Sequence, residues 1–211
     1  MTSALLDHPT PDSVSLIPVA ENDFNAWLDV QDDAWRRWLT ATGFKAKPDS
    51  YHLIAGADGR LQAVVAGIRT ADDLWALGGL PASLPEGDYV LDAPFTPRQI
   101  EQLTLGWALG AYRFTRYKAP KRAMARLALD SACDASRIQR HVAAVTLVRD
   151  LINTPAEDLM PEHLAEATQA LAQDFGATFA QLVGDELLAH GFPVIHTVGR
   201  ASIHPPRLLD L

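Results

Sequence analysis

Residues 149–171, RDLINTPAEDLMPEHLAEATQAL, decide how the rest of the chain is organised. A helical pattern ends at Asn153-Thr154-Pro155, because the residue before a proline is disfavoured in the right-handed helical region. A short acidic loop follows, and Pro161 then stands at a first helical position, where proline is well tolerated. Helix, loop and helix in this order indicate a joint between two domains.

The joint resembles the start of the catalytic domain in the leucyl aminopeptidases, where an Asn-Thr-Pro-Ala-Glu-like turn ends a linker helix. Other segments are similar to this family and follow in the family's order: residues 110–114, 117–118, 184–188, 198–202 and 205–209. The resemblance covers residues 100–211 well and residues 1–99 loosely. Met160 departs from it, because the family usually has a threonine there, whose N-cap oxygen would contribute about 1 kcal/mol to helix stability.

The resemblance implies an α/β fold in three parts. These are an N-terminal macro-like α/β domain over residues 1–132, a linker helix over 133–153, and the incomplete beginning of an α/β metallopeptidase domain over 154–211. It also implies a homohexameric enzyme that removes N-terminal amino acids from peptides with two zinc or manganese ions. In that mechanism the metals polarise the scissile carbonyl and activate a bridging water.

In this family the carboxylates and the lysine that hold the metals follow the position that matches Leu211. We therefore assign no catalytic, cofactor-binding or metal-ligating residue to this chain, and we expect the chain alone to be inactive. The residues after Pro155 form one βαβ-like unit, which buries too little apolar surface to be more than marginally stable alone. This agrees with the front portion of a longer enzyme.

The composition is typical of a soluble globular protein, with 48% hydrophobic and 21% charged residues. The net charge of −8 argues against general affinity for nucleic acid or anionic membranes. Cys133 is the single cysteine, so an internal disulfide is excluded. The N-terminus lacks the pattern of a signal peptide, and no apolar run approaches the ~20 residues that span a bilayer. We expect a cytoplasmic protein.

Hydrophobic periodicity predicts alternating strands and helices before the joint. Thr96, Pro97 and Gln99 are typical of a helix start closed by a capping box. Gly106 and Gly110 lie one turn apart on this helix, which favours close packing against a sheet over a GxxxG dimer seam, a motif of membrane spans. The expected strands are 13–19, 51–55, 61–68, 88–91 and 123–129, and the expected helices lie near 24–28, 35–39 and 74–80 and after Pro97.

After the joint, spacing predicts a helix that ends at Gly176. Its expected buried stripe is Leu164, Ala167, Leu171 and Phe175. A strand over 177–183, a short helix capped by Asp185 and ended by Gly191, a helix from Pro193 and a strand from Leu208 complete the expected elements.

Histidines and clustered carboxylates are the candidate metal ligands of the sequence. No zinc-binding spacing occurs among the histidines, which favours capping and surface roles; they are His8, His52, His141, His163, His190, His196 and His204. Glu157, Asp158 and Glu162 gather at the joint and could suggest a metal or an acid/base pair. Carboxylates near a helix N-terminus are stabilised by the helix dipole without any chemistry, and we favour that interpretation.

Two rival functions remain. Basic and aromatic residues alternate as single-stranded nucleic acid binding requires, although basic groups at a helix end often only complement its dipole; they are Arg113, Phe114, Arg116, Tyr117, Lys118, Lys121, Arg122 and Arg126. The alternative from a different class is a non-catalytic assembly or ligand-binding module, with a nucleotide-like ligand. No glycine-rich phosphate loop supports it, so we favour the aminopeptidase.

Overall fold

The structure is a computed structural model that describes residues 4–131 and 133–211. The chain divides into two compact units, Met1–Thr146 and Leu147–Leu211. The division falls within helix α5 (Ala135–Asn153). Asp134 stabilises the start of this helix, because its carboxylate accepts a 2.9 Å hydrogen bond from the Arg137 backbone N–H.

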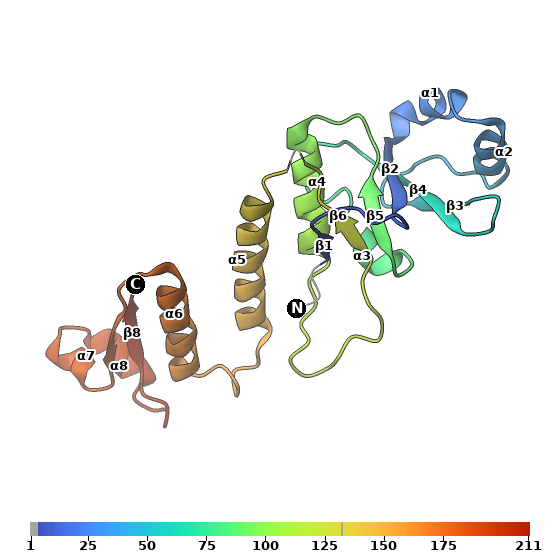
Figure 1. Ribbon diagram of the computed structural model, residues 1–211. Helices are drawn as coiled ribbons and strands as arrows, with labels where there is room; N and C mark the ends of the chain where they lie inside the picture. Colours follow the sequence, from blue (N-terminus) through green and yellow to red (C-terminus); the bar gives the residue numbers. More distant parts are fainter. Residues whose placement is uncertain (1–3, 132) are drawn as a thin grey trace. The chain divides into compact units, whose positions relative to one another are not determined.

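A mixed sheet forms the centre of the N-terminal unit (Figure 1). Its strands lie in the order β1-β6-β5-β2-β4-β3, and every neighbouring pair is parallel except β3 and β4. The predicted α/β class is therefore confirmed. The strands are β1 (Leu5–Leu6), β2 (Val14–Ala20), β3 (Tyr51–Ala55), β4 (Leu61–Ile68), β5 (Asp88–Leu91) and β6 (Arg126–Ala128).

Helices cover both faces of this sheet, as the burial of β4 requires. Successive strand residues point to opposite faces, so Val65 packs with Phe24 and Leu39 on one face. Val64 packs with Trp107 on the other. The first face carries η1 (Glu21–Asp23), α1 (Phe24–Asp29) and α2 (Asp33–Ala41), and the second carries α3 (Leu80–Ser83) and α4 (Pro97–Gly110).

Helix α4 begins as its sequence predicts. Thr96 Oγ1 accepts from the Gln99 backbone N–H at 3.4 Å, and Gln99 Oε1 accepts from the Thr96 N–H at 3.1 Å. These reciprocal bonds satisfy two backbone donors at the helix terminus. The predicted capping box is confirmed.

The predicted helix over residues 74–80 is wrong. Residues 74–79 form turns, and α3 begins only at Leu80. Gly78 and Gly79 are poor helix formers, and Pro81 is tolerated only in the first turn of a helix. This turn segment packs against α4 so closely that a Cβ on Gly106 would overlap the Leu74 carbonyl oxygen. The close packing was expected, but its partner is the turn rather than the sheet.

Two short strands differ from the sequence pattern. β1 was not predicted, because its two residues carry no periodic signal, although Leu5 and Leu6 pair with Leu127 and Ala128. The expected strand over 123–129 is reduced to β6, Arg126–Ala128. Ala125 is still fully buried in the main core, and its N–H donates to the Pro81 carbonyl at 3.1 Å. The loop therefore enters the core before strand pairing begins.

The C-terminal unit contains helix α6 and a two-stranded sheet. Strands β7 and β8 are antiparallel, so the predicted βαβ-like arrangement is wrong. Parallel strands need a crossover, usually one helix that returns the chain to the same end. Here the connection is broken at Gly191 into two short helices. The elements are α6 (Pro161–Phe175), β7 (Ala180–Val183), α7 (Glu186–Ala189), α8 (Pro193–Gly199) and β8 (Arg207–Asp210).

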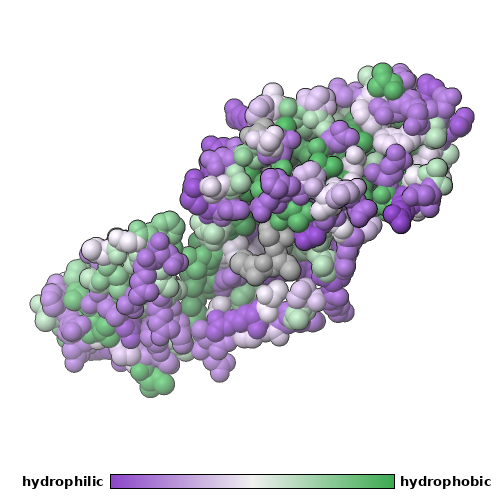
Figure 2. All heavy atoms as spheres, viewed as in Figure 1, coloured by the Kyte–Doolittle hydropathy of each residue, from purple (hydrophilic) through white to green (hydrophobic). Residues whose placement is uncertain are grey.

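The predicted apolar stripe of α6 is only partly covered: Ala167 and Leu171 are half-buried, and the most deeply buried residues are two other alanines. Ala165 and Ala172 are 4% and 2% exposed, whereas Leu164 is 44% and Phe175 is 73% exposed. Alanine lets the α6 backbone approach β8 closely, which bulky side chains on that face would prevent. Leu164 and Phe175 lie on the surface, and Figure 2 shows hydrophobic residues on the visible face of this unit.

Candidate functional site

The joint between α5 and α6 is held by local hydrogen bonds. The Thr154 backbone N–H and hydroxyl both donate to the Asp150 carbonyl, at 3.0 and 2.7 Å. Thr154 is 8% exposed, so the second of these two hydrogen bonds satisfies a buried hydroxyl at the end of the helix. The chain then turns, and the Asp158 N–H donates to the Pro155 carbonyl at 2.9 Å. The predicted helix end at 153–155 is confirmed.

Helix α6 starts with Met160 at its N-cap and Pro161 as its first residue, as predicted. The Met160 backbone N–H donates to Nδ1 of His163 at 3.0 Å. The imidazole therefore occupies the place of the glutamate or glutamine side chain in a capping box. His163 compensates in part for the missing threonine, and Nδ1 must be unprotonated to accept this bond.

Glu162 and His204 are paired at the joint, with 2.5 Å between Oε1 and Nδ1. The backbone N–H of Glu162 lowers the pKa of its carboxyl, and the hydrogen bond from His204 adds to this effect. The first cause is expected of a carboxylate in the first turn of a helix, and the second of any carboxylate that accepts a hydrogen bond. Oε2 of Glu162 is buried and has no hydrogen-bond partner among the described residues.

Two further histidines contact carbonyls of their own helix, and a third contacts a carboxylate eleven residues away. His141 and His190 contact the carbonyls of Arg137 and Glu186 through Nδ1, at 2.7 and 2.9 Å. His196 Nε2 lies 3.0 Å from Asp185 Oδ1. Asp185 stands at the N-cap of α7, as predicted, but its side chain forms no capping bond and contacts His196 instead.

His52 has a different environment, because it lies on β3 between aromatic rings. The Trp38 and Phe44 ring centroids are 5.8 and 5.6 Å from its own. Burial lowers the pKa of this imidazole, and its Nε2 has no hydrogen-bond partner in the described structure. This environment favours the neutral form of the imidazole at the edge of the core.

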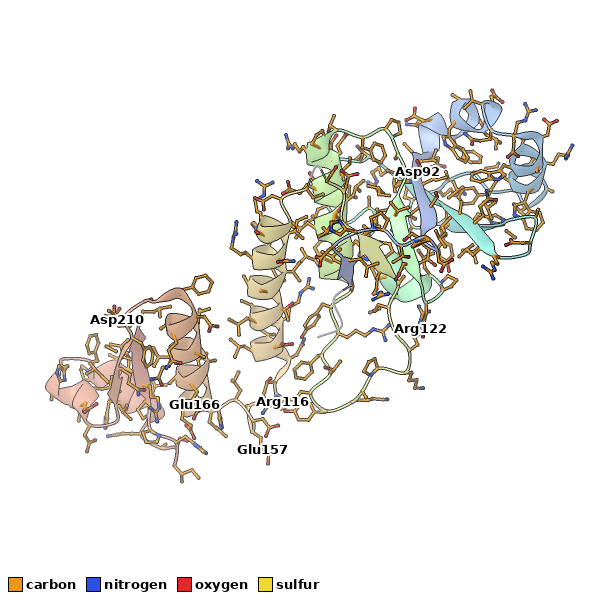
Figure 3. All side chains as sticks on the ribbon, in the orientation of Figure 1. Asp92, Arg116, Arg122, Glu157, Glu166 and Asp210 are labelled. Carbon is orange, nitrogen blue, oxygen red and sulfur yellow. The ribbon has the colours of Figure 1, made fainter. Side chains whose placement is uncertain are left out.

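The described residues do not assemble a metal site. Within 4–131 and 133–211, no three or more histidine, cysteine, aspartate or glutamate side chains come together as metal ligands would. Protein metal centres of the zinc type need at least three such ligands. Glu157 extends from the joint and Glu166 from α6 (Figure 3), but neither completes a set with Glu162. The residues present do not fit a two-metal centre, so no catalytic step is derived for them.

Part of the basic and aromatic segment is engaged within the N-terminal unit. Arg122 donates to the backbone carbonyls of Leu84 and Ala82. Arg126 pairs with Asp88 at 2.7 Å. The Arg116 guanidinium lies 5.7 Å from the ring centroid of Tyr117, which also contacts Phe114 edge-on. These contacts give structural roles to residues that nucleic acid binding would need to keep available.

No helix in the described part of the chain is both long enough and apolar enough to span a bilayer.

Two family models match the chain on either side of its division. The N-terminal domain of M17 aminopeptidases matches residues 14–130, and the catalytic domain of the cytosol aminopeptidase family matches residues 146–211. The chain belongs to the M17, or cytosol, aminopeptidase family.

Individual relatives of the chain carry the same family description. A probable cytosol aminopeptidase of Leifsonia xyli is 32% identical over 82% of this chain and 38% of its own length. Another, of Mycobacterium sp. strain KMS, is 30% identical over 95% and 44%. The crystal structure of the cytosol aminopeptidase from Coxiella burnetii superposes with a TM-score of 0.88 and 31% identity, over 98% of this chain and 45% of that one. The chain thus spans about two fifths of the length of these relatives.

Proposed function

We propose that this chain supplies the first part of a two-metal leucyl aminopeptidase, which removes N-terminal amino acids from peptides. Residues 1–132 would form its N-terminal domain, 133–153 its linker helix and 154–211 the start of its catalytic domain. The match of residues 146–211 to the catalytic-domain model carries this proposal. The same match disfavours a purely ligand-binding module, because such a module has no use for the start of a peptidase domain.

The burial pattern of the C-terminal unit supports the proposal independently. Within residues 147–211, all of which the structure describes, the buried hydrophobic residues are Ala165, Ala172 and Leu187. In the same unit five large apolar side chains are between 73% and 92% exposed: Ile152, Phe175, Val194, Val198 and Ile203. So small a core contributes little stability. In the whole enzyme, the remainder of the catalytic domain would cover these side chains.

The metals would be bound by residues outside this chain, and manganese and zinc are the candidates. A more distant structural relative, the bottromycin maturation enzyme BotP, was solved in complex with Mn; it is 24% identical with a TM-score of 0.71. When bound, such metals polarise a carbonyl and activate water. The proposal also includes a cytoplasmic location, which the relatives' description as cytosol aminopeptidases supports. Assembly as a homohexamer is its last part.

The proposal is tested by joining this chain to the remaining part of the Coxiella burnetii enzyme, beyond the region that superposes. The hybrid is expected to hydrolyse leucine 4-nitroanilide with added manganese, and the 211-residue chain alone is expected not to. Circular dichroism of both proteins controls for folding. Metal-dependent turnover by the pure 211-residue chain, or a folded hybrid that fails to turn over, would contradict the assignment.

A further inference from the structure

The N-terminal unit has a topological switch point between β2 and β5. These strands are parallel neighbours. After β2 the chain continues to β3 and β4 on one side of the sheet, whereas after β5 it continues to β6 on the other. Where connections diverge in this way, open α/β sheets leave a crevice that binds ligands. This location depends on the strand order alone and not on the aminopeptidase assignment.

β5 ends earlier than β2, which leaves a notch at this edge of the sheet. β5 ends at Leu91, opposite Leu16, while β2 continues to Ala20 along β4. The Asp92 backbone N–H still donates to the Leu16 carbonyl at 2.8 Å, and the chain then turns away. Backbone groups alternate along a strand, so the next β2 residue facing this edge is Pro18, which has no N–H to leave unpaired. The sequence therefore accommodates an open edge at this point.

A hollow of about 540 Å³ occupies the notch. Its apolar lining comes from Ile17, Leu91, Ala93 and Pro94. Trp27 forms one wall, and its indole is fixed by Phe24, with ring centroids 6.0 Å apart, and by Trp35, at 6.4 Å. Small-molecule pockets in proteins have volumes of roughly 300–1,000 Å³, mostly apolar walls and few polar groups. The volume of the hollow falls in this range, and its lining combines apolar side chains with polar groups.

Both polar side chains of the hollow carry acceptor oxygens. Asp92, an exposed residue labelled in Figure 3, lines the hollow, and its carboxylate forms no ion pair with any residue in the described ranges 4–131 and 133–211. Gln31 also lines it and donates its amide N–H to the Trp27 carbonyl at 2.9 Å, which leaves the amide oxygen as an acceptor. No lysine, arginine or histidine belongs to the lining.

This combination selects a class of ligand. A carboxylate and an amide oxygen favour a primary ammonium group, and the indole face attracts the same charge. The apolar walls favour a compact hydrocarbon or aromatic body beside that charge. A phosphate or carboxylate would instead meet Asp92 with no cation to offset the repulsion, which disfavours nucleotides.

We propose that this hollow binds a small primary amine on an apolar body, with the ammonium at Asp92 and Gln31 and the body against Trp27 and Ile17. The site lies wholly within the N-terminal unit. It adds a small-molecule ligand to a domain for which the proposed function requires none.

Calorimetry of the whole 211-residue chain with 2-phenylethylamine tests the proposal. Matched probes are the neutral 2-phenylethanol and the anionic 3-phenylpropanoate. The amine is expected to bind, and the alcohol to bind about fivefold more weakly, the difference that one partly exposed ion pair supplies. Asp92→Asn should reduce amine affinity by a similar factor, whereas Asp12→Asn, at an exposed position outside the hollow, should not.

The indole N–H resonance of Trp27 provides the site-specific readout. It is expected to shift with the amine and to retain that shift in Asp12→Asn. Absence of amine binding, equal affinities for amine and alcohol, or unchanged amine affinity in a folded Asp92→Asn protein would each overturn the proposal. None of these measurements depends on peptidase activity, so the outcome is independent of the proposed function.

Discussion

Gly106→Ala is expected to lower the free energy of unfolding of the N-terminal unit by about 3 kcal/mol, the upper range for overpacking. The added Cβ would overlap the Leu74 carbonyl oxygen, a backbone atom that cannot rotate away. Either α4 or the 74–79 turn must move, and both border the main core. Alanine has the higher helix propensity, so a loss of stability would arise despite that gain.

Thermal unfolding followed by circular dichroism measures this effect. A loss of about 3 kcal/mol corresponds to a decrease in Tm of roughly 6–12 °C for a unit of this size. Gly79→Ala is the matched control, because Gly79 has a φ of −80° and an added Cβ would meet nothing within 4 Å. Equal Tm values for Gly106→Ala and Gly79→Ala would show that α4 and the turn are not in tight contact.

Leu187→Ala is expected to unfold the C-terminal unit while leaving the N-terminal unit folded. Leu187 is fully buried, and the other buried hydrophobic residues of the completely described range 147–211 are alanines. Truncating a buried leucine costs about 2–5 kcal/mol. A core this small supplies only about 3–5 kcal/mol in total, so the loss removes most of the unit's stability.

Amide hydrogen exchange separates the two units in this experiment. Protection should disappear across α6, β7 and β8 in Leu187→Ala and persist in β2 and β4. The neighbouring variant Leu188→Ala is the control, because Leu188 is 48% exposed and its truncation leaves little cavity. Retained protection of α6 in Leu187→Ala would mean that the stability of this unit does not depend on the buried Leu187 side chain.

Local chemistry made part of the fold predictable. Strands β3 and β4 match the predicted ranges 51–55 and 61–68, because a turn ending in Gly59, with φ of 78°, separates two strongly hydrophobic runs. The start of α4 and the joint at 153–155 were equally clear from capping and proline rules. These elements depend on neighbouring residues.

The errors arose where distant contacts decide. The face that α6 buries depends on how closely its alanines approach β8, and hydrophobicity alone selected the larger Leu164 and Phe175 instead. The antiparallel pairing of β7 with β8 depends on the whole connection between them. Sequence spacing also gave no sign of the hollow, since Trp27, Gln31 and Asp92 become neighbours only through the strand order and the early end of β5.

The contacts at the joint between α5 and α6 indicate structural roles for its polar side chains. The joint contains a capping histidine and a helix-terminal carboxylate, whose lowered pKa follows from its own backbone N–H and from His204. Such groups stabilise the entrance to a domain without performing chemistry. These contacts at the joint are structural, and under the proposed function the metals would be bound by residues outside this chain.

Metal content of the purified 211-residue chain tests this central claim most directly. After equilibrium dialysis against manganese or zinc, elemental analysis is expected to find no stoichiometric metal, because the described side chains form pairs and no larger ligand group. Two tightly held divalent ions per folded chain, lost on substitution of Glu162 or His204, would contradict the account.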